Sequence, residues 1–233
     1  MNASAARDEH ALSRSVEDYL KAIYHLSLDG QPATTSQIAE MLEVAPPSVS
    51  GMVKRLSEQG LLEHVPYRGV ELTEQGRRAA LRMVRRHRII EAYLVARLGY
   101  TWDRVHEEAE RLEHAVSDTL IERMAIALGN PQFDPHGDPI PDAQGRIQEH
   151  PHTPLAEIPL GETVEIRRVD TSEADRLRYI GASGLTPGTT ITVIDRQPFD
   201  GPITVRAEGR DKVIGFELSR LILCLRRVAS VAP

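Results

Sequence analysis

The spacing of apolar positions changes character twice along the 233-residue chain. From residue 13 to 129, apolar side chains recur every three or four positions, which predicts helices over about 13–29, 37–42, 46–59, 74–98 and 102–129. Residues 130–159 contain seven prolines and little periodicity, as is typical of a semi-rigid linker. Beyond residue 160, alternating segments at 163–169, 189–195, 202–207, 212–216 and 221–228, with a short helix near 172–180, predict a small open β-barrel.

The first 75 residues predict a winged helix-turn-helix. Three helices are followed by a hairpin, 61–65 and 70–72, around the turn 66–69. In such a unit the third helix lies in the major groove of DNA and the wing approaches the phosphates. We expect base and backbone contacts, with Lys54 and Arg68 on phosphates, from this set: Gln37, Pro46, Pro47, Ser48, Ser50, Lys54 and Arg68. The alternative for Ser48 and Ser50 is that they are ordinary hydroxyls on a helix surface.

The two long helices, 74–98 and 102–129, carry wide apolar stripes. Stripes of this width need a partner, and a homodimer is the economical explanation. The sequence therefore predicts a mainly α chain with an α+β part, divided into a DNA-binding domain at 1–75, a helical domain at 76–145, a linker at 146–159 and the barrel at 160–233.

The net charge of −6 does not favour DNA binding by itself, but the charge is unevenly distributed. Residues 76–98 contain seven arginines and a single acid, Glu91, between two acidic segments. No long apolar run predicts a membrane span, and the polar N-terminus lacks the apolar region of a signal peptide. Together with the single cysteine, Cys224, which we expect in a core, this predicts a cytoplasmic protein.

Imidazoles and carboxylates gather on the two long helices. At about 100° per residue, His106, Glu110, Glu113 and His114 share an arc of about 100°. On the preceding helix, His87 and Glu91 form an i,i+4 pair. Such groups are ligands for a divalent transition metal. The alternative is that they are solvated faces of acidic helices.

Patterns for catalysis are missing. His106-Glu107 is not followed by the second histidine of a zinc protease motif, and position 111, where a di-iron bundle needs glutamate, is arginine. The sequence has no glycine-rich phosphate loop and no nucleophile elbow. We therefore expect no enzyme and no small organic substrate. Two alternatives stay open: a metal-independent regulator whose barrel binds a small molecule or peptide, and a metallohydrolase with a vestigial DNA-binding domain.

The whole pattern resembles the diphtheria toxin repressor family of metalloregulators. The residues that carry the resemblance are His106-x3-Glu110-x2-Glu113-His114, preceded by His87-x3-Glu91 and a winged helix, with further likeness at 15–24 and 134–141. It extends to the barrel, which is similar to the SH3-like domain of three-domain members. The resemblance implies two metal sites per subunit. The primary site would comprise Asp18, Glu110, Glu113 and His114, and the ancillary site His87, Glu91 and His106, to which the barrel adds Glu173. At the second barrel position this chain has Arg176, so either Asp175 substitutes as the ligand or that contact is lost.

The resemblance also suggests the metal. Iron-type members carry sulfur ligands where this chain has Asp18 and Glu110, and oxygen ligands favour Mn(II). Fe(II) is the second candidate, because neither geometry nor affinity order separates the two ions cleanly. Lys21 occupies the position of a second acid in the short manganese regulators, which favours two separate sites over a binuclear one. A metal that joins Asp18 to the helical domain would set the spacing of the two DNA-binding domains of the dimer on a palindromic operator. The metal-loaded dimer would then repress metal-uptake genes.

Overall fold

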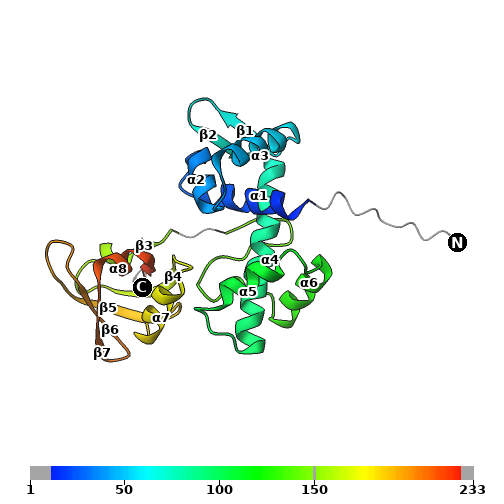
Figure 1. The fold of residues 1–233 in the computed structure, drawn as a ribbon. Coiled ribbons are helices and arrows are strands. Elements are labelled where there is room, and N and C mark those ends of the chain that lie inside the picture. The colour runs from blue at the N-terminus through cyan, green and yellow to red at the C-terminus, as the bar shows by residue number, and fades with distance from the viewer. Residues whose placement is uncertain (1–11, 149–150, 227–233) are drawn as a thin grey trace, which may run out of the picture. The chain divides into compact units, whose positions relative to one another are not determined.

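The structure is a computed structural model that describes residues 12–148 and 151–226. The chain divides into two compact units, Met1–Arg85 with Pro141–Arg146 and Arg86–Ile140 with Ile147–Pro233 (Figure 1). The boundary falls inside one long helix, so the helical domain expected over 76–145 contributes to both units.

The first unit contains the expected winged helix-turn-helix. Helices α1 (Arg14–Leu26), α2 (Thr35–Met41) and α3 (Pro46–Glu58) precede the antiparallel hairpin of β1 (Leu62–Val65) and β2 (Gly69–Leu72). A capping box begins α2, because Thr34 and Gln37 accept hydrogen bonds from each other's backbone amides. Ala33 and Val70 exchange two backbone hydrogen bonds of 2.9 Å, which attach the wing to the segment before α2. This prediction is confirmed.

Helix α4 (Glu74–Leu98) has the bounds that the sequence predicts, and Thr73 caps its first turn. The expected single helix over 102–129 is wrong, because the chain forms α5 (Val105–Leu112) and α6 (Asp118–Ala127) instead. Between them Ser117 adopts an extended conformation and its side chain accepts from the amide of Leu120. A new helix therefore starts at Asp118.

The proline-rich segment is partly built into the folded domains. Phe133 and Pro139 form an antiparallel bridge, and the Arg88 side chain donates to the carbonyl of Pro139 at 2.6 Å. Further along, Arg85 donates to the carbonyl of Pro141 at 2.8 Å. The sheet then begins inside the expected linker, since β3 (Thr153–Pro154) pairs with the last strand and η1 (Leu155–Glu157) follows it.

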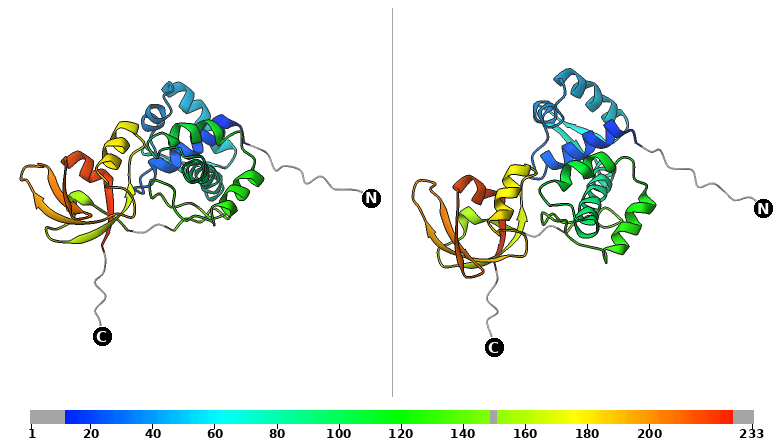
Figure 2. Two further views of the ribbon diagram at one scale, coloured as in Figure 1. Left: turned by 90° about the horizontal axis from the view of Figure 1, so that it is seen from below. Right: turned by 60° about the horizontal axis from the view of Figure 1, so that its bottom comes forward.

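The C-terminal part is a six-stranded antiparallel sheet in the order β3-β8-β4-β5-β6-β7. Besides β3, its strands are β4 (Thr163–Val169), β5 (Thr190–Arg196), β6 (Ile203–Ala207), β7 (Arg210–Ile214) and β8 (Ile222–Arg226). Helices α7 (Ala174–Ala182) and α8 (Phe216–Leu221) accompany it (Figure 2). The sequence pattern missed α8 and β3 and placed β7 two residues too late.

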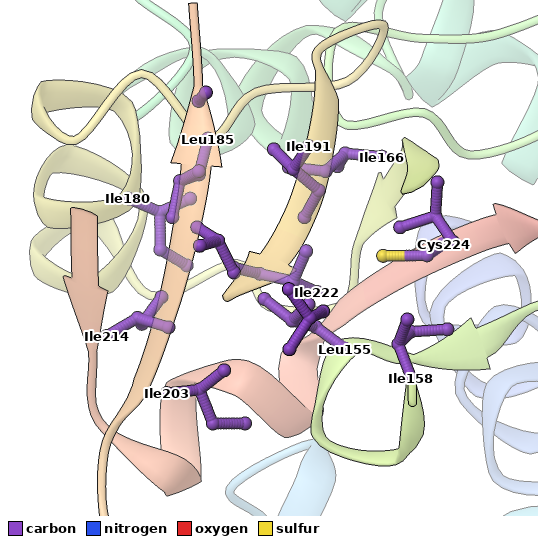
Figure 3. Close-up of a cluster of buried hydrophobic side chains, with 14 of the residues drawn as sticks. Leu155, Ile158, Ile166, Ile180, Leu185, Ile191, Ile203, Ile214, Ile222 and Cys224 are labelled. Carbon is purple, nitrogen blue, oxygen red and sulfur yellow. The ribbon is translucent and has the colours of Figure 1, made fainter. Parts of the chain in front are cut away.

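Branched aliphatic side chains fill this sheet's core, where Cys224 is also buried, as expected (Figure 3). Leu155 and Ile158, from the expected linker, belong to the same core and are fully buried. Their burial explains why the compact domain starts before residue 160. Among the described residues, no helix is both long enough and apolar enough to cross a membrane.

Candidate metal centre

The second half of α4 and the neighbouring α5 supply most of the candidate ligands. His87 and Glu91 are one turn apart on α4, and His106 and Glu110 are one turn apart on α5. Apolar residues on the other faces of these helices form a common core, which includes Ile90 and Ala109. This packing brings the two polar faces together.

His87 lies at the middle of the cluster. Its Nε2 atom is 3.0 Å from the Glu91 carboxylate and 3.0 Å from Nδ1 of His106. Its Nδ1 atom is 2.6 Å from Glu113 and 3.6 Å from Glu110. Ligand atoms of His87, His106 and Glu110 all lie within 4.8 Å of one another, a separation that one metal ion can span.

Glu113 and His114 follow directly at the end of α5. The carboxylate of Glu113 is fully buried, and its second oxygen lies 3.4 Å from Nε2 of His114. Because Glu113 also contacts His87, the two sets that the resemblance separates form one continuous cluster within this unit. Glu110, assigned to the primary set, lies beside His87 and His106 of the ancillary set.

Two further ligand candidates come from the irregular segment 133–140, and the sequence pattern did not predict them. Ligand atoms of Glu91, Asp134 and His136 also lie within 4.8 Å of one another, and all three residues are buried. Asp134 accepts the backbone amides of His136 and Asp138, which fixes this turn. The sequence does show a histidine, His136, two residues after Asp134. Because this segment has no helical periodicity, the spacing did not predict that either residue lies near Glu91.

The electrostatics of this buried group favour a cation. Burial alone would raise the pKa of Glu91, but hydrogen bonds with three surrounding imidazoles lower that pKa well below its ordinary value. For Asp134, burial and the charge of Asp138 raise the pKa to about 8. Burial opposes charge on His136, yet the hydrogen bond and charge of Glu91 raise its pKa to about 9. A buried carboxylate such as Glu91 needs neighbouring positive charge, which imidazolium or a metal ion can supply.

The chemistry of these donors fits a divalent metal of the first transition series. The groups of candidate ligands combine carboxylate oxygens with imidazole nitrogens. The orientation of the buried His136 ring is fixed by a hydrogen bond, because its Nε2 atom donates to the carbonyl of Trp102 at 2.8 Å. Ligands held in this way require little reorganisation when an ion binds.

The remaining three predicted ligands come from elements other than α4 and α5. Asp18 is a half-buried residue of α1 in the first unit. Glu173 is exposed and pairs with Arg176 at 2.8 Å, and Asp175 is exposed and pairs with Arg178 at 2.8 Å. Neither barrel acid belongs to the ligand groups found among the described residues, so both stay predictions from the resemblance.

Trp102 connects the cluster to the barrel. Its indole stacks on His136 with ring centroids 5.7 Å apart and packs against the barrel core. A Cβ atom at Gly181 of α7 would lie only 2.7 Å from the indole nitrogen, so glycine is needed for this approach. Glycine is also needed at position 137, because its φ of +87° and the nearby carbonyl of Arg167 exclude a side chain.

The candidate DNA-reading face belongs to the first unit. On α3, Pro46, Pro47, Ser48, Ser50 and Lys54 are all exposed, while Val49 and Val53 on the opposite face are buried. Four of the expected contact residues have partners within the protein. Ser50 donates to the carbonyl of Pro46 at 3.2 Å, and Lys54 pairs with Glu58 at 4.0 Å. Gln37 closes the capping box of α2, and Arg68 on the wing donates to the Gln31 side chain at 2.6 Å.

The comparisons with known proteins decide the family. Residues 11–70 match the iron dependent repressor N-terminal DNA binding domain, residues 73–142 its metal binding and dimerisation domain, and residues 153–225 the FeoA domain. The iron-dependent repressor IdeR of Mycobacterium tuberculosis is 33% identical over 211 residues, which are 85% of this chain and 91% of the relative. This chain belongs to the diphtheria toxin repressor family. The diphtheria toxin repressor of Corynebacterium diphtheriae is itself 30% identical over 218 residues, 89% of this chain and 95% of that repressor.

Solved structures of family members agree with the three-domain architecture. A manganese-dependent transcriptional repressor in complex with manganese aligns with a TM-score of 0.82 and 39% identity, over 91% of this chain and 99% of that one. The manganese regulator SloR aligns with a TM-score of 0.72 and 33% identity, over 91% of this chain and 98% of that one. The predicted family and fold class, with an SH3-like third domain, are confirmed, and the family consists of metal-dependent DNA-binding repressors rather than enzymes.

Proposed function

We propose that this chain is a manganese(II)-responsive repressor that acts in the cytoplasm as a homodimer on a palindromic operator. Iron(II) is the second candidate for the metal that activates it. The oxygen and nitrogen donors around His87, Glu91, His106, Glu110, Glu113 and His114 carry the proposal. Hard and borderline donors of this kind suit Mn(II) and Fe(II) better than thiophilic ions. The regulated genes would be those for metal uptake.

Each subunit would hold two metal ions. One would be bound around Glu113, where His114 and Glu110 contribute and the resemblance adds Asp18 from α1. The other would be bound around Glu91, with His87 and His106. Asp134 and His136, which lie beside Glu91, extend the ligands available to the second ion. A bound divalent cation supplies positive charge that neutralises the buried carboxylates.

Metal binding and DNA binding would be coupled within this chain. When metal binding raises DNA affinity, DNA must raise metal affinity by the same factor, typically 5- to 150-fold or about 1–3 kcal/mol. On the DNA side, the exposed face of α3 would contact bases and phosphates through Ser48, Ser50 and Lys54. Arg68 of the wing donates to the Gln31 side chain at 2.6 Å, so a DNA phosphate would share or replace this hydrogen bond.

The ligand assignment is tested by Mn(II) titration of chelator-treated protein, with free Mn(II) followed by its electron paramagnetic resonance signal. We expect two ions per subunit, and competition with anaerobic Fe(II) ranks the two metals. Glu113→Gln should weaken binding more than tenfold. Glu107→Gln is the matched control, because Glu107 lies on the same helix with its side chain exposed. Equal binding by both variants would show that Glu113 is not a ligand.

A further inference from the structure

The arginines of α4 fall into two groups with different surroundings. Four of them bind other parts of the chain: Arg85 and Arg88 reach backbone carbonyls of the 139–141 segment, Arg97 reaches the carbonyl of Ala127, and Arg86 binds Asp118 at 2.7 Å. These contacts give four of the seven arginines a structural role. The other three, in the first half of the helix, are exposed: Arg77, Arg78 and Arg82.

Two of the exposed arginines line an open cavity of about 620 Å³ within the first unit. One wall is the start of α4 and the other is the loop 144–146, which adds a third guanidinium. The residues around it are Glu74, Arg77, Arg78, Leu81, Gln144, Gly145 and Arg146. Three cations and one carboxylate give this lining a positive charge, although the whole chain is acidic.

Each of the three guanidiniums is oriented by a neighbour. Arg77 lies over the Tyr24 ring, 5.6 Å from its centroid, and Arg78 pairs with Glu74 at 3.0 Å. Arg146 pairs with Asp142 at 2.7 Å. Asp142 also accepts the amides of residues 144 and 146, which folds the loop tightly and, with the Arg146 ion pair, lowers the pKa of Asp142. The loop thus presents its arginine toward α4.

The geometry points to a binding site for a small phosphate-bearing molecule in this cavity. Planar guanidiniums bind phosphate through paired, charge-assisted hydrogen bonds, and oriented ones lose little freedom on binding. The volume lies in the range of small-ligand sites, about 300–1,000 Å³, and is too large for one phosphate group alone. The side-chain amide of Gln144 offers hydrogen-bonding groups for the rest of the molecule, while Leu81 forms the buried base of the lining. We therefore assign a ligand of nucleotide size. The assignment is independent of the metal proposal.

The test is isothermal titration calorimetry on the chelator-treated full-length protein with inorganic phosphate, pyrophosphate and ADP as probes. We expect one ADP per chain, weaker binding of pyrophosphate, and inorganic phosphate at least tenfold weaker than ADP. Arg77→Gln with Arg146→Gln should weaken ADP binding about tenfold for each guanidinium removed. Arg123→Gln removes the same charge from an exposed position on α6 and should leave binding unchanged.

Three results would overturn the assignment. One is the absence of binding by every probe at millimolar concentration. Another is equal weakening by Arg123→Gln, which would mean that the phosphates respond only to the overall charge. A third is that the double variant, still folded by circular dichroism, loses DNA affinity while wild-type protein binds none of the probes. That result would assign the cavity to binding of DNA phosphates instead.

Discussion

Replacing Gly181 of α7 by alanine tests how the barrel is attached to the metal-binding helices. The added Cβ would lie 2.7 Å from the indole nitrogen of Trp102 and 3.1 Å from another ring atom, where ordinary contacts begin near 3.4 Å. The indole is packed against the barrel core and stacked on His136, so it cannot turn aside freely.

Two opposing effects set the size of the change. Alanine within a helix is favoured over glycine by about 0.5–1 kcal/mol. Overpacking of an established contact typically costs about 1–3 kcal/mol. We therefore expect Gly181→Ala to destabilise the second unit by about 1 kcal/mol, and to move the indole of Trp102.

The assay uses the fact that Trp102 is the only tryptophan in the chain. Its emission should shift to longer wavelength and its quenching by acrylamide should increase in Gly181→Ala. Gly215→Ala is the control, because a Cβ at Gly215 meets nothing within 4 Å and the emission should stay as in the wild type. Unchanged Trp102 emission together with increased stability in Gly181→Ala would refute the close packing of Trp102 on α7.

Three further predictions concern the rest of the chain. Thr34→Ala opens the capping box of α2 and should lower the free energy of unfolding by about 1 kcal/mol in thermal melts; no change would mean that the cap is not formed. Gly51→Ala on α3, where a Cβ meets nothing within 4 Å, should raise it by about 0.5–1 kcal/mol, and a loss would contradict the open position of Gly51. Burial raises the pKa of the Cys224 thiol to about 12, so the thiol stays protonated below that pH. A disulfide reagent at pH 8 should therefore react with it only after unfolding, and rapid reaction of the native protein would contradict this.

The elements that the sequence predicted best are those with strong local signals. Helix α4 was bounded by its cap at Thr73 and by Gly99, and the wing by the hairpin turn around Gly69. The break between α5 and α6 was missed because the apolar spacing continues through Val116. Only the capping geometry of Ser117 shows that the helix restarts.

The candidate site was predictable to the extent that it lies on helices. The i,i+4 spacing was enough to place His87 with Glu91, and His106 with Glu110, on common faces. Asp134 and His136 could not be found this way, because a tertiary turn, not a periodic element, brings them to Glu91.

The most direct test of the central claim is operator binding measured by fluorescence anisotropy, with DNA from upstream of the chain's own gene. Chelator-treated protein is titrated with and without Mn(II), and then with anaerobic Fe(II). We expect a 5- to 150-fold gain in DNA affinity when Mn(II) is present, and loss of that gain in Glu110→Ala but not in Glu107→Ala. Equal DNA affinity with and without metal would contradict it.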